Sequence, residues 1–157
     1  MTDNYLIVPY RKEHGDQIIN EGLNYELLKI DASYEELRID HSRPGMSFTL
    51  LGDGTPIVCG GIIPLWNGVC EGWIIGGKRI FQAKIKAARL IKKRTDLLCL
   101  NNNVSRLQTA VKAGFKEGYR FAKFLGLQDE GLMKKYGPDG SDYYRMAKIY
   151  LWVLLET

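Results

Sequence analysis

Cysteine and histidine are scarce in this chain of 157 residues, and neither is arranged for metal binding or cross-linking. The three cysteines, Cys59, Cys70 and Cys99, are widely spaced and odd in number, and no Cys-x-x-Cys pair occurs. The two histidines, His14 and His41, lie far from them in the sequence. A zinc site or a disulfide framework is therefore not expected, and free thiols in a reducing compartment are the simplest interpretation. Ser-His-Asp or Cys-His catalysis has little support, because no nucleophile-elbow pattern occurs.

Long apolar runs, internal repeats and low-complexity segments are also missing. No run approaches the roughly 18 apolar residues of a membrane span, and Met1–Asn4 lacks the basic region and apolar core of a signal peptide. We therefore expect a cytoplasmic protein with no membrane partner. An apolar content of 45% and a charged content of 25% are those of an ordinary soluble globule. The length is close to the usual size of one domain, so residues 1–157 are expected to form a single domain.

The start of the chain predicts one strand followed by two helices. Tyr5–Tyr10 is rich in residues that favour strands. Apolar residues at helical spacing predict a helix over Asp16–Leu28. Ser33 precedes Glu36 by three residues, which is the capping-box spacing at the start of a second helix, and Pro44-Gly45 ends that helix.

Three strands separated by turns are predicted next. They cover Ser47–Leu51, Ile57–Leu65 and Val69–Ile75. The first two are joined by Gly52-Asp53-Gly54, which is a signal for a tight hairpin. Gly60-Gly61 interrupts the second strand and indicates either a β-bulge or a close backbone contact.

A long basic helix is expected to open at Gly76-Gly77. Its apolar residues, from Ile80 to Ile91, recur mostly every three or four positions. The stretch from Lys78 to Arg94 carries eight lysines and arginines and no acidic residue. Such a block favours an anionic partner, which could be cofactor phosphates, nucleic acid or an acidic protein, although a solvated helix face has the same composition.

The next segment allows two interpretations. Alternation over Ser105–Lys112 predicts a strand, and Lys116–Leu125 then predicts a short helix. Alternatively, Leu97–Leu100 forms the strand and Val104–Ala113 forms a helix. We prefer the first interpretation, because it leaves one helix between this strand and the last two strands.

The end of the chain predicts an antiparallel hairpin. Leu132–Tyr136 and Tyr143–Ile149 flank the turn Gly137-Pro138-Asp139-Gly140-Ser141. Its proline presets φ, its aspartate can accept backbone hydrogen bonds, and its second glycine can supply a positive φ. Trp152–Leu155 is a short apolar tail that could pack on the edge of the domain or bind a partner.

This order of elements, with Phe124-Leu125-Gly126-Leu127 and Glu130-Gly131 ahead of the hairpin, resembles the GNAT acyltransferase superfamily over essentially the whole chain. The resemblance implies an α/β (α+β) fold with a mixed, mostly antiparallel twisted sheet, flanking helices and a C-terminal β-hairpin. More narrowly, Arg106–Ala110 and Gly137–Tyr143 resemble segments of small GNAT-like proteins encoded by short-tailed bacteriophages. Such an origin implies a place in the host cytoplasm or in the virion.

In GNAT enzymes the fourth strand and the start of the next helix bind coenzyme A. Free backbone groups of the strand pair with the pantetheine amides, and helix N–H groups receive the pyrophosphate. The positions that the resemblance implies here are Trp73, Ile74, Ile75, Gly76, Gly77, Lys78 and Arg79. The glycines allow the backbone to approach phosphate closely, and the two cations add charge. Acetyl-coenzyme A is the expected co-substrate, with no metal.

The resemblance also implies catalytic residues. Glu71 lies on the strand where many family members place a glutamate that deprotonates the amine, which cannot attack a thioester while it is protonated. The family's general acid is often a tyrosine four residues before the glycine of the Leu-Gly turn, but Ala122 holds that position here. Tyr119, about one turn earlier, is the expected substitute, with Tyr136 and Tyr143 as alternatives.

The implied function is transfer of an acetyl group from acetyl-coenzyme A to an amine of a protein or a small molecule. The alternative is a non-catalytic, virion-associated or host-protein-binding module with a degenerate cofactor cleft, because the family's usual loop pattern, Gln/Arg-x-x-Gly-x-Gly/Ala, is not matched. An acidic protein, or a phage or host protein, is the further partner considered. Nucleic acid is not expected, because few aromatic residues accompany the basic helix.

Overall fold

The computed structural model describes residues 4–21, 43–76, 79 and 85–151. The strands in this part of the chain are β1 (Tyr5–Val8), β2 (Ser47–Gly52), β3 (Thr55–Trp66), β4 (Val69–Gly76), β5 (Arg106–Lys112), β6 (Gln128–Met133) and β7 (Tyr143–Ile149). The helices there are α1 (Lys12–Asn20), α5 (Ile85–Asn101) and α6 (Lys116–Phe124). The strands form one sheet in the order β1-β2-β3-β4-β5-β7-β6, and neighbours run antiparallel except for β4 and β5. The mixed, mostly antiparallel sheet predicted from the sequence is confirmed.

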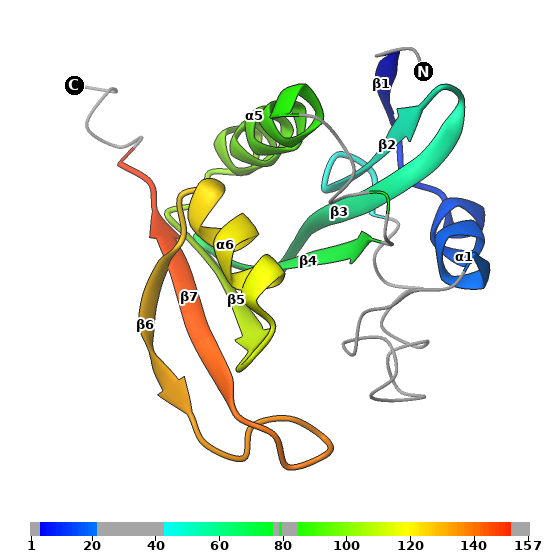
Figure 1. Ribbon diagram of the computed structural model, residues 1–157. Helices are drawn as coiled ribbons and strands as arrows, with labels where there is room; N and C mark the ends of the chain where they lie inside the picture. The colour runs from blue at the N-terminus through cyan, green and yellow to red at the C-terminus, as the bar shows by residue number, and fades with distance from the viewer. Residues whose placement is uncertain (1–3, 22–42, 77–78, 80–84, 152–157) are drawn as a thin grey trace.

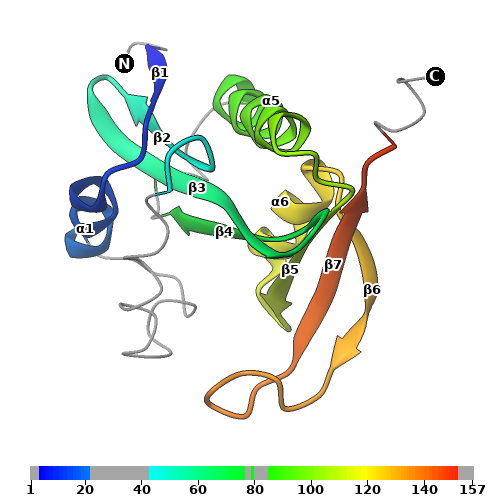
Figure 2. The ribbon, with the colours of Figure 1, turned by 180° about the vertical axis from the view of Figure 1, so that it is seen from behind.

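Different helices cover the two faces of this sheet. On one face lie α5 and α6, next to each other (Figure 1), and Ile91 and Leu98 of α5 share an apolar core with Ile62 of β3. On the other face lies α1, where Ile18 shares a smaller core with Ile75 of β4. Figure 2 shows α1 well away from β5, β7 and β6, and its contacts are mainly with β3 and β4. No described helix therefore covers these strands on the side opposite α6, which we call the open face.

A polar joint fixes α5 to the end of β7. Asp96 of α5 accepts hydrogen bonds at Oδ1 from Lys148 Nζ (2.9 Å) and from the Tyr150 hydroxyl (2.7 Å). The same Lys148 Nζ also donates to the carbonyl oxygen of Leu125, just after α6 (3.2 Å). Burial and the hydrogen bond to Asp96 raise the pKa of Tyr150, so its hydroxyl stays protonated and keeps donating. This joint holds both helices against one end of the sheet.

Most predicted elements are present close to their predicted positions. The strand predicted at Ser105–Lys112 is β5, and the helix predicted at Lys116–Leu125 is α6. The alternative assignment is wrong, because Leu97–Leu100 lies in the last turns of α5. The tight turn between β2 and β3 is also confirmed, with φ values of 51° at Asp53 and 82° at Gly54.

The first helix begins earlier than predicted, at Lys12 instead of Asp16. Its start is stabilised by an unusual cap in which His14 Nδ1 accepts a hydrogen bond from the backbone N–H of Arg11 (3.2 Å). The Thr49 hydroxyl of β2 lies 2.8 Å from the same ring nitrogen and ties this helix end to the sheet. Histidine is not among the residues that usually signal a capping box, so the pattern was missed.

The first strand of the C-terminal hairpin is also displaced from its prediction. Instead of Leu132–Tyr136, β6 covers Gln128–Met133. The chain turns away at Lys135, which has a φ of 57° and donates its backbone N–H to Asp142 Oδ1 (2.9 Å). The strand is at the edge of the sheet and almost wholly exposed, so it carries no apolar alternation that could reveal it.

Several predictions concern residues outside the described ranges. These are the later part of the Asp16–Leu28 helix, the helix after Ser33, the opening of the basic helix at Gly77, and the Trp152–Leu155 tail.

The two glycines in β3 mark a close backbone contact and not a bulge. The register of β3 shifts elsewhere, opposite Leu50/Leu51 of β2 and between Pro64 and Trp66. A Cβ atom on Gly61 would overlap the backbone carbonyl oxygen of Met46. Of the two alternatives that the sequence left open, the close contact is therefore confirmed.

This contact makes Gly61 more sensitive to substitution than its neighbour. We expect Gly61→Ala to lower the free energy of unfolding by about 2 kcal/mol, because backbone atoms must move to accommodate the methyl group. The matched control is Gly60→Ala, whose Cβ would lie 3.2 Å from the ring of Phe48, a side chain that can shift. Urea denaturation measures both variants. Equal stability of the two would contradict the close contact.

Candidate active site

The strands β4 and β5 pair over a short stretch and then separate. Their parallel ladder joins Val69–Glu71 to Arg106–Gln108. Both strands are described in full, and beyond the ladder β4 continues to Gly76 and β5 to Lys112 without further pairing to each other. Figure 1 shows the two arrows diverging. This divergence opens the middle of the sheet at the point where Glu71 is followed by Gly72.

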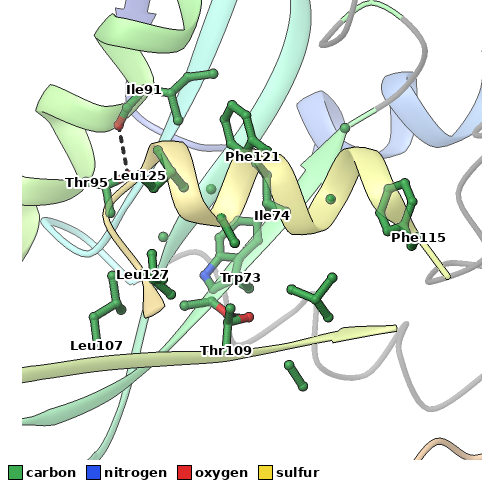
Figure 3. Close-up of a pocket in the computed structure, with 18 of the residues that line it drawn as sticks. Trp73, Ile74, Ile91, Thr95, Leu107, Thr109, Phe115, Phe121, Leu125 and Leu127 are labelled. Atoms are coloured by element: carbon green, nitrogen blue, oxygen red, sulfur yellow. Dashed lines mark hydrogen bonds between the residues drawn. The ribbon is translucent and has the colours of Figure 1, made fainter. Parts of the chain in front are cut away.

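An apolar cleft of about 160 Å³ lies between the separated strands, α5 and α6. Figure 3 shows α6 running along the cleft, with Phe115 near one end and Leu125 near the other. Two threonines line it, and both hydroxyls are used within the protein. Thr95 donates to the carbonyl oxygen of Ile91 (2.8 Å), and Thr109 donates to that of Gly72 (3.2 Å). The side chains therefore offer a ligand mainly apolar contact.

Polar contact in the cleft comes from the backbone of β4. The carbonyl oxygen of Gly72 faces β5, because it accepts the hydrogen bond from Thr109. Backbone groups of alternate residues in a strand point to the same side, so the N–H and C=O of Ile74 also face the cleft. Those of Trp73 and Ile75 face the other neighbour, β3. Among Trp73, Ile74 and Ile75, Ile74 is thus the residue with backbone groups directed at the cleft.

The neighbouring predicted cofactor residues differ in whether they line the cleft. Trp73 is among the lining residues, but its indole packs on the α1 side of the sheet, edge-on against Tyr10, with ring centroids 5.2 Å apart. Gly76 also lines the cleft, at the end of β4. Ile75 is fully buried in the core with α1 and does not line the cleft.

The predicted phosphate-binding segment is described at two residues, Gly76 and Arg79. Gly77 and Lys78 lie outside the described ranges. Arg79 is exposed and forms an ion pair with Glu21, at the end of α1, with a distance of 3.3 Å between Nη2 and Oε2. An exposed pair of this kind contributes little stability, so Arg79 can exchange Glu21 for another anion at small cost.

Glu71, the predicted general base, lies on the open face beside the point where the strands part. Its neighbours in the ladder, Cys70 and Leu107, belong to the core beneath α5, so strand alternation directs Glu71 and Gln108 to the opposite face. Glu71 Oε2 accepts a hydrogen bond from Gln108 Nε2 (3.1 Å). Its other oxygen, Oε1, lies 3.3 Å from Nη1 of Arg145 on β7.

Sequence reasoning did not identify Gln108 or Arg145 as part of this site. A usable signal for Gln108 was present, because Arg106 and Gln108 are two residues apart in a predicted strand and must share a face. No such signal existed for Arg145. Its approach to Glu71 depends on β7 lying beside β5, which only the order of strands in the sheet decides.

Tyr119, the predicted general acid, is directed away from the cleft. It is not among the lining residues, and its hydroxyl donates to Asp129 Oδ2 of β6 (3.0 Å). Its ring packs edge-on against Tyr144, with centroids 5.5 Å apart. The hydrogen bond to the Asp129 carboxylate raises the pKa of Tyr119, because removing the proton would place two negative groups together. The structure therefore does not bring Tyr119 together with Glu71.

Three further features concern thiols, metal ligands and membrane-spanning helices. All three cysteines are buried and free, and burial raises the pKa of Cys59 to about 12, so it is a thiol at neutral pH. In the described ranges no three His, Cys, Asp or Glu side chains gather as ligands of a metal ion. The helices described there are too short or too polar to cross a lipid bilayer.

The Tyr119–Asp129 bond gives a prediction about titration. We expect Asp129→Asn to lower the pKa of Tyr119, and Glu13→Gln on distant α1 to leave it unchanged. The pKa of Tyr119 is higher in the folded state than its ordinary value of 10.0. The hydrogen bond to Asp129 therefore contributes its full stabilisation at pH values below 10.0, and this stabilisation is lost as the pH rises through the raised pKa. The pKa of Tyr119 can be measured by NMR of ¹³C-labelled tyrosine, with Tyr119→Phe used to assign the signal. An unmoved titration in Asp129→Asn would show that the bond is not formed in solution.

Comparison with known proteins finds similarity in structure and none in sequence. No protein-family model matches the sequence, and no curated protein matches it either. Solved structures match over nearly the full length. Ard1 from Thermoplasma volcanium aligns with a TM-score of 0.73 at 16% identity, covering 94% of this chain and 98% of that one.

Two further structures agree with this result. A GNAT-family acetyltransferase from Streptococcus pneumoniae has a TM-score of 0.71 at 15% identity, covering 94% of this chain and 100% of that one. A ribosomal-protein-alanine N-acetyltransferase from Brucella melitensis has a TM-score of 0.70 at 15% identity, with coverages of 92% and 99%. At such low identity the similarity concerns the fold alone. The chain therefore has the fold of the GNAT acetyltransferases.

Proposed function

We propose that this protein is an acyl-coenzyme A-dependent N-acetyltransferase acting on an amine of a protein or a small molecule. The observation that carries the proposal is the short β4–β5 ladder. The ladder ends at Glu71, and the next residue, Gly72, lines the apolar cleft. The carboxylate of Glu71 is therefore held one residue from the start of the cleft. A thioester at the closed end of the cleft and an amine on the open face would then meet beside Glu71. We also propose that residues 1–157 form a single domain.

Acetyl-coenzyme A is the proposed co-substrate. Its pantetheine arm consists of alkyl and amide groups, and the cleft offers apolar walls together with the backbone N–H and C=O of Ile74. The predicted residues Trp73 and Ile75 support this strand from the side of α1. The phosphates are proposed to bind at the end of β4, at Gly76, Gly77, Lys78 and Arg79. Glycine allows close approach there and the two cations add charge.

In the proposed reaction, Glu71 accepts a proton from the ammonium form of the substrate. The free amine attacks the thioester carbonyl carbon, a C–N bond forms, and the C–S bond breaks to release coenzyme A as a thiolate. The nitrogen, which is positively charged after the attack, gives its second proton to solvent, and the thiolate takes up a proton from solvent. Each carboxylate oxygen can accept two hydrogen bonds. The contacts that Glu71 already makes with Gln108 and Arg145 therefore leave room for the amine proton.

Tyr119 stays a predicted general acid that would have to leave Asp129 in order to reach the cleft. The proposed reaction does not require it, because a coenzyme A thiolate is stable enough to leave without a proton donor. The proposal therefore depends on Glu71 and not on Tyr119.

The narrower assignment, to a phage-encoded protein of the host cytoplasm or virion, rests on the Arg106–Ala110 and Gly137–Tyr143 segments. The first segment supplies Arg106 and Gln108 of the open face. In the second, Asp139 Oδ1 accepts hydrogen bonds from the backbone and hydroxyl of Ser141. A non-catalytic module that binds a phage or host protein, including an acidic one, is the outcome to consider if the cleft does not bind coenzyme A.

Cofactor binding is the first prediction of this proposal. Isothermal titration calorimetry should give a micromolar dissociation constant for acetyl-coenzyme A and a similar value for free coenzyme A. ADP, which carries the diphosphate without the pantetheine arm, should bind at least about tenfold more weakly, because the cleft would contribute nothing to it. Absence of detectable acetyl-coenzyme A binding would contradict the proposal and favour the non-catalytic module.

The second prediction concerns Glu71. Thiol release from acetyl-coenzyme A should be measured with spermidine and with a peptide that begins with alanine as trial acceptors. We expect Glu71→Gln to lower kcat by about 100-fold, which is typical for loss of a general base. Calorimetric binding of acetyl-coenzyme A should change less than twofold, because Glu71 faces away from the cleft walls.

The matched control is Glu13→Gln, the same change at an exposed position of α1. This variant should keep full activity. Wild-type activity in Glu71→Gln would show that another group accepts the proton.

A further inference from the structure

The open face carries a continuous chain of side chains that ends at Glu71. It runs from Glu130 of β6 through Arg106 and Gln108 of β5. We propose that Gln108 is a positioning residue for Glu71, and that Arg106 and Glu130 act through Gln108 by holding its amide in one orientation. This inference rests on the proposed function, because it assigns a role in the reaction that Glu71 is proposed to perform.

The orientation of the Gln108 amide follows from its two neighbours. Arg106 Nε can only donate, so the atom 2.9 Å from it must be the carbonyl oxygen Oε1 of Gln108. The amide nitrogen then faces Glu71 Oε2 at 3.1 Å, where it donates to a group that can only accept when ionised. The reversed amide would set donor against donor and acceptor against acceptor. A glutamine, which is free to flip elsewhere, is therefore fixed here.

Arg106 itself forms a bidentate salt bridge with Glu130. Its Nη1 and Nη2 donate to the two carboxylate oxygens of Glu130, at 3.0 and 2.5 Å. Such paired bonds fix the plane of a guanidinium as well as its position. The hydrogen bond from Arg106 lowers the pKa of Glu130, so this carboxylate stays ionised at neutral pH and keeps accepting both hydrogen bonds from Arg106. The direction of Arg106 Nε toward Gln108 is set by this contact.

Strand alternation directs Glu130 of β6 to the open face, opposite to Asp129. The pairing register between β6 and β7 shifts between Asp129 and Gly131, and Gly131 has a φ of 132°. Asp129 lies on the α6 side, where it accepts from Tyr119, while Glu130 reaches Arg106 on the other side. The register shift leaves Glu130 without a cross-strand partner on β7, as is usual for the extra residue of a bulge. Glu130 therefore contacts Arg106 of β5 from an unpaired position of the edge strand.

The second oxygen of Glu71 is held from a different strand. Arg145 Nη1 of β7 lies 3.3 Å from Oε1, and its guanidinium carbon lies 5.7 Å from the centre of the Tyr136 ring. With Gln108 on one oxygen and Arg145 on the other, the carboxylate cannot rotate without losing a contact. Misplacement of a reacting group by about 1 Å can cost about 100-fold in rate. This is the effect that loss of Gln108 should produce.

Three variants test the proposal through kcat and KM. Gln108→Glu keeps the shape of the side chain and its contact with Arg106 but removes the donor to Glu71, whereas Gln108→Leu removes both polar contacts. We expect both to lower kcat by about 10- to 100-fold, with KM for acetyl-coenzyme A within about twofold and thermal stability close to wild type. The control is Gln128→Leu. Gln128 is an exposed glutamine in the same cross-strand row, since both Gln108 and Gln128 pair with Ala147. Among the described residues, none forms a hydrogen bond with the Gln128 side chain.

Gln108→Glu separates positioning from packing. If the role of Gln108 were to fill space, the isosteric glutamate would keep kcat while leucine lost it. Wild-type kcat in Gln108→Glu would overturn the proposal, and so would an equal loss of kcat in Gln128→Leu.

A measurement that does not use activity separates this proposal from the function on which it rests. In ¹⁵N-labelled protein, the Nε2 protons of Gln108 should exchange with water more slowly than those of Gln128, and Arg106→Ala should abolish the difference. Equal exchange in the wild type would overturn the positioning whatever the activity. A second outcome is slow exchange at Gln108 in a protein that neither binds nor turns over acetyl-coenzyme A. The amide would then be fixed as described, but the proposed function would be wrong, and the positioning role would be overturned with it.

Discussion

The candidate site depends on one constraint, which is that β4 and β5 pair over three residues and no further. Beyond Glu71 and Gln108, the backbone of β4 has no strand partner on the β5 side, although α5 and α6 surround it with apolar groups. A buried backbone N–H or C=O that lacks a partner costs about 1–3 kcal/mol. Under the proposed function, a ligand that carries amide groups on an apolar chain would supply these partners. The joint of Asp96, Lys148 and Tyr150 keeps the helices in place above it.

The same ladder organises the opposite face. Its register aligns Ile63, Glu71, Gln108 and Ala147 in one row across four strands. Because side chains alternate along a strand, a slip of one residue would send Glu71 into the core and bring Cys70 to the surface. The cleft and the carboxylate are thus two consequences of a single register. In the proposed reaction, the thioester and the amine approach from opposite faces and meet where the strands part.

Local signals were sufficient for much of the fold. The turn at Asp53-Gly54, the alternation in β5 and the amphipathic pattern of α6 each depend on neighbours in the sequence, and each was predicted correctly. The start of α1 and the position of β6 were not. The first depends on a histidine cap supported by Thr49, and the second depends on an edge strand whose exposed residues carry no apolar pattern.

For the site, the sequence by itself determined the chemistry that is available. It places a glutamate in the fourth strand of the sheet, glycines at the end of that strand, and an Arg-x-Gln pair on one face of the next strand. Tertiary structure alone decided which of these groups meet. Gln108 and Arg145 reach Glu71 from strands that lie 37 and 74 residues away along the chain, while Tyr119 is drawn to Asp129 instead of the cleft. The physical reason is that strand order and register set distances between side chains, and neither is encoded in any local segment.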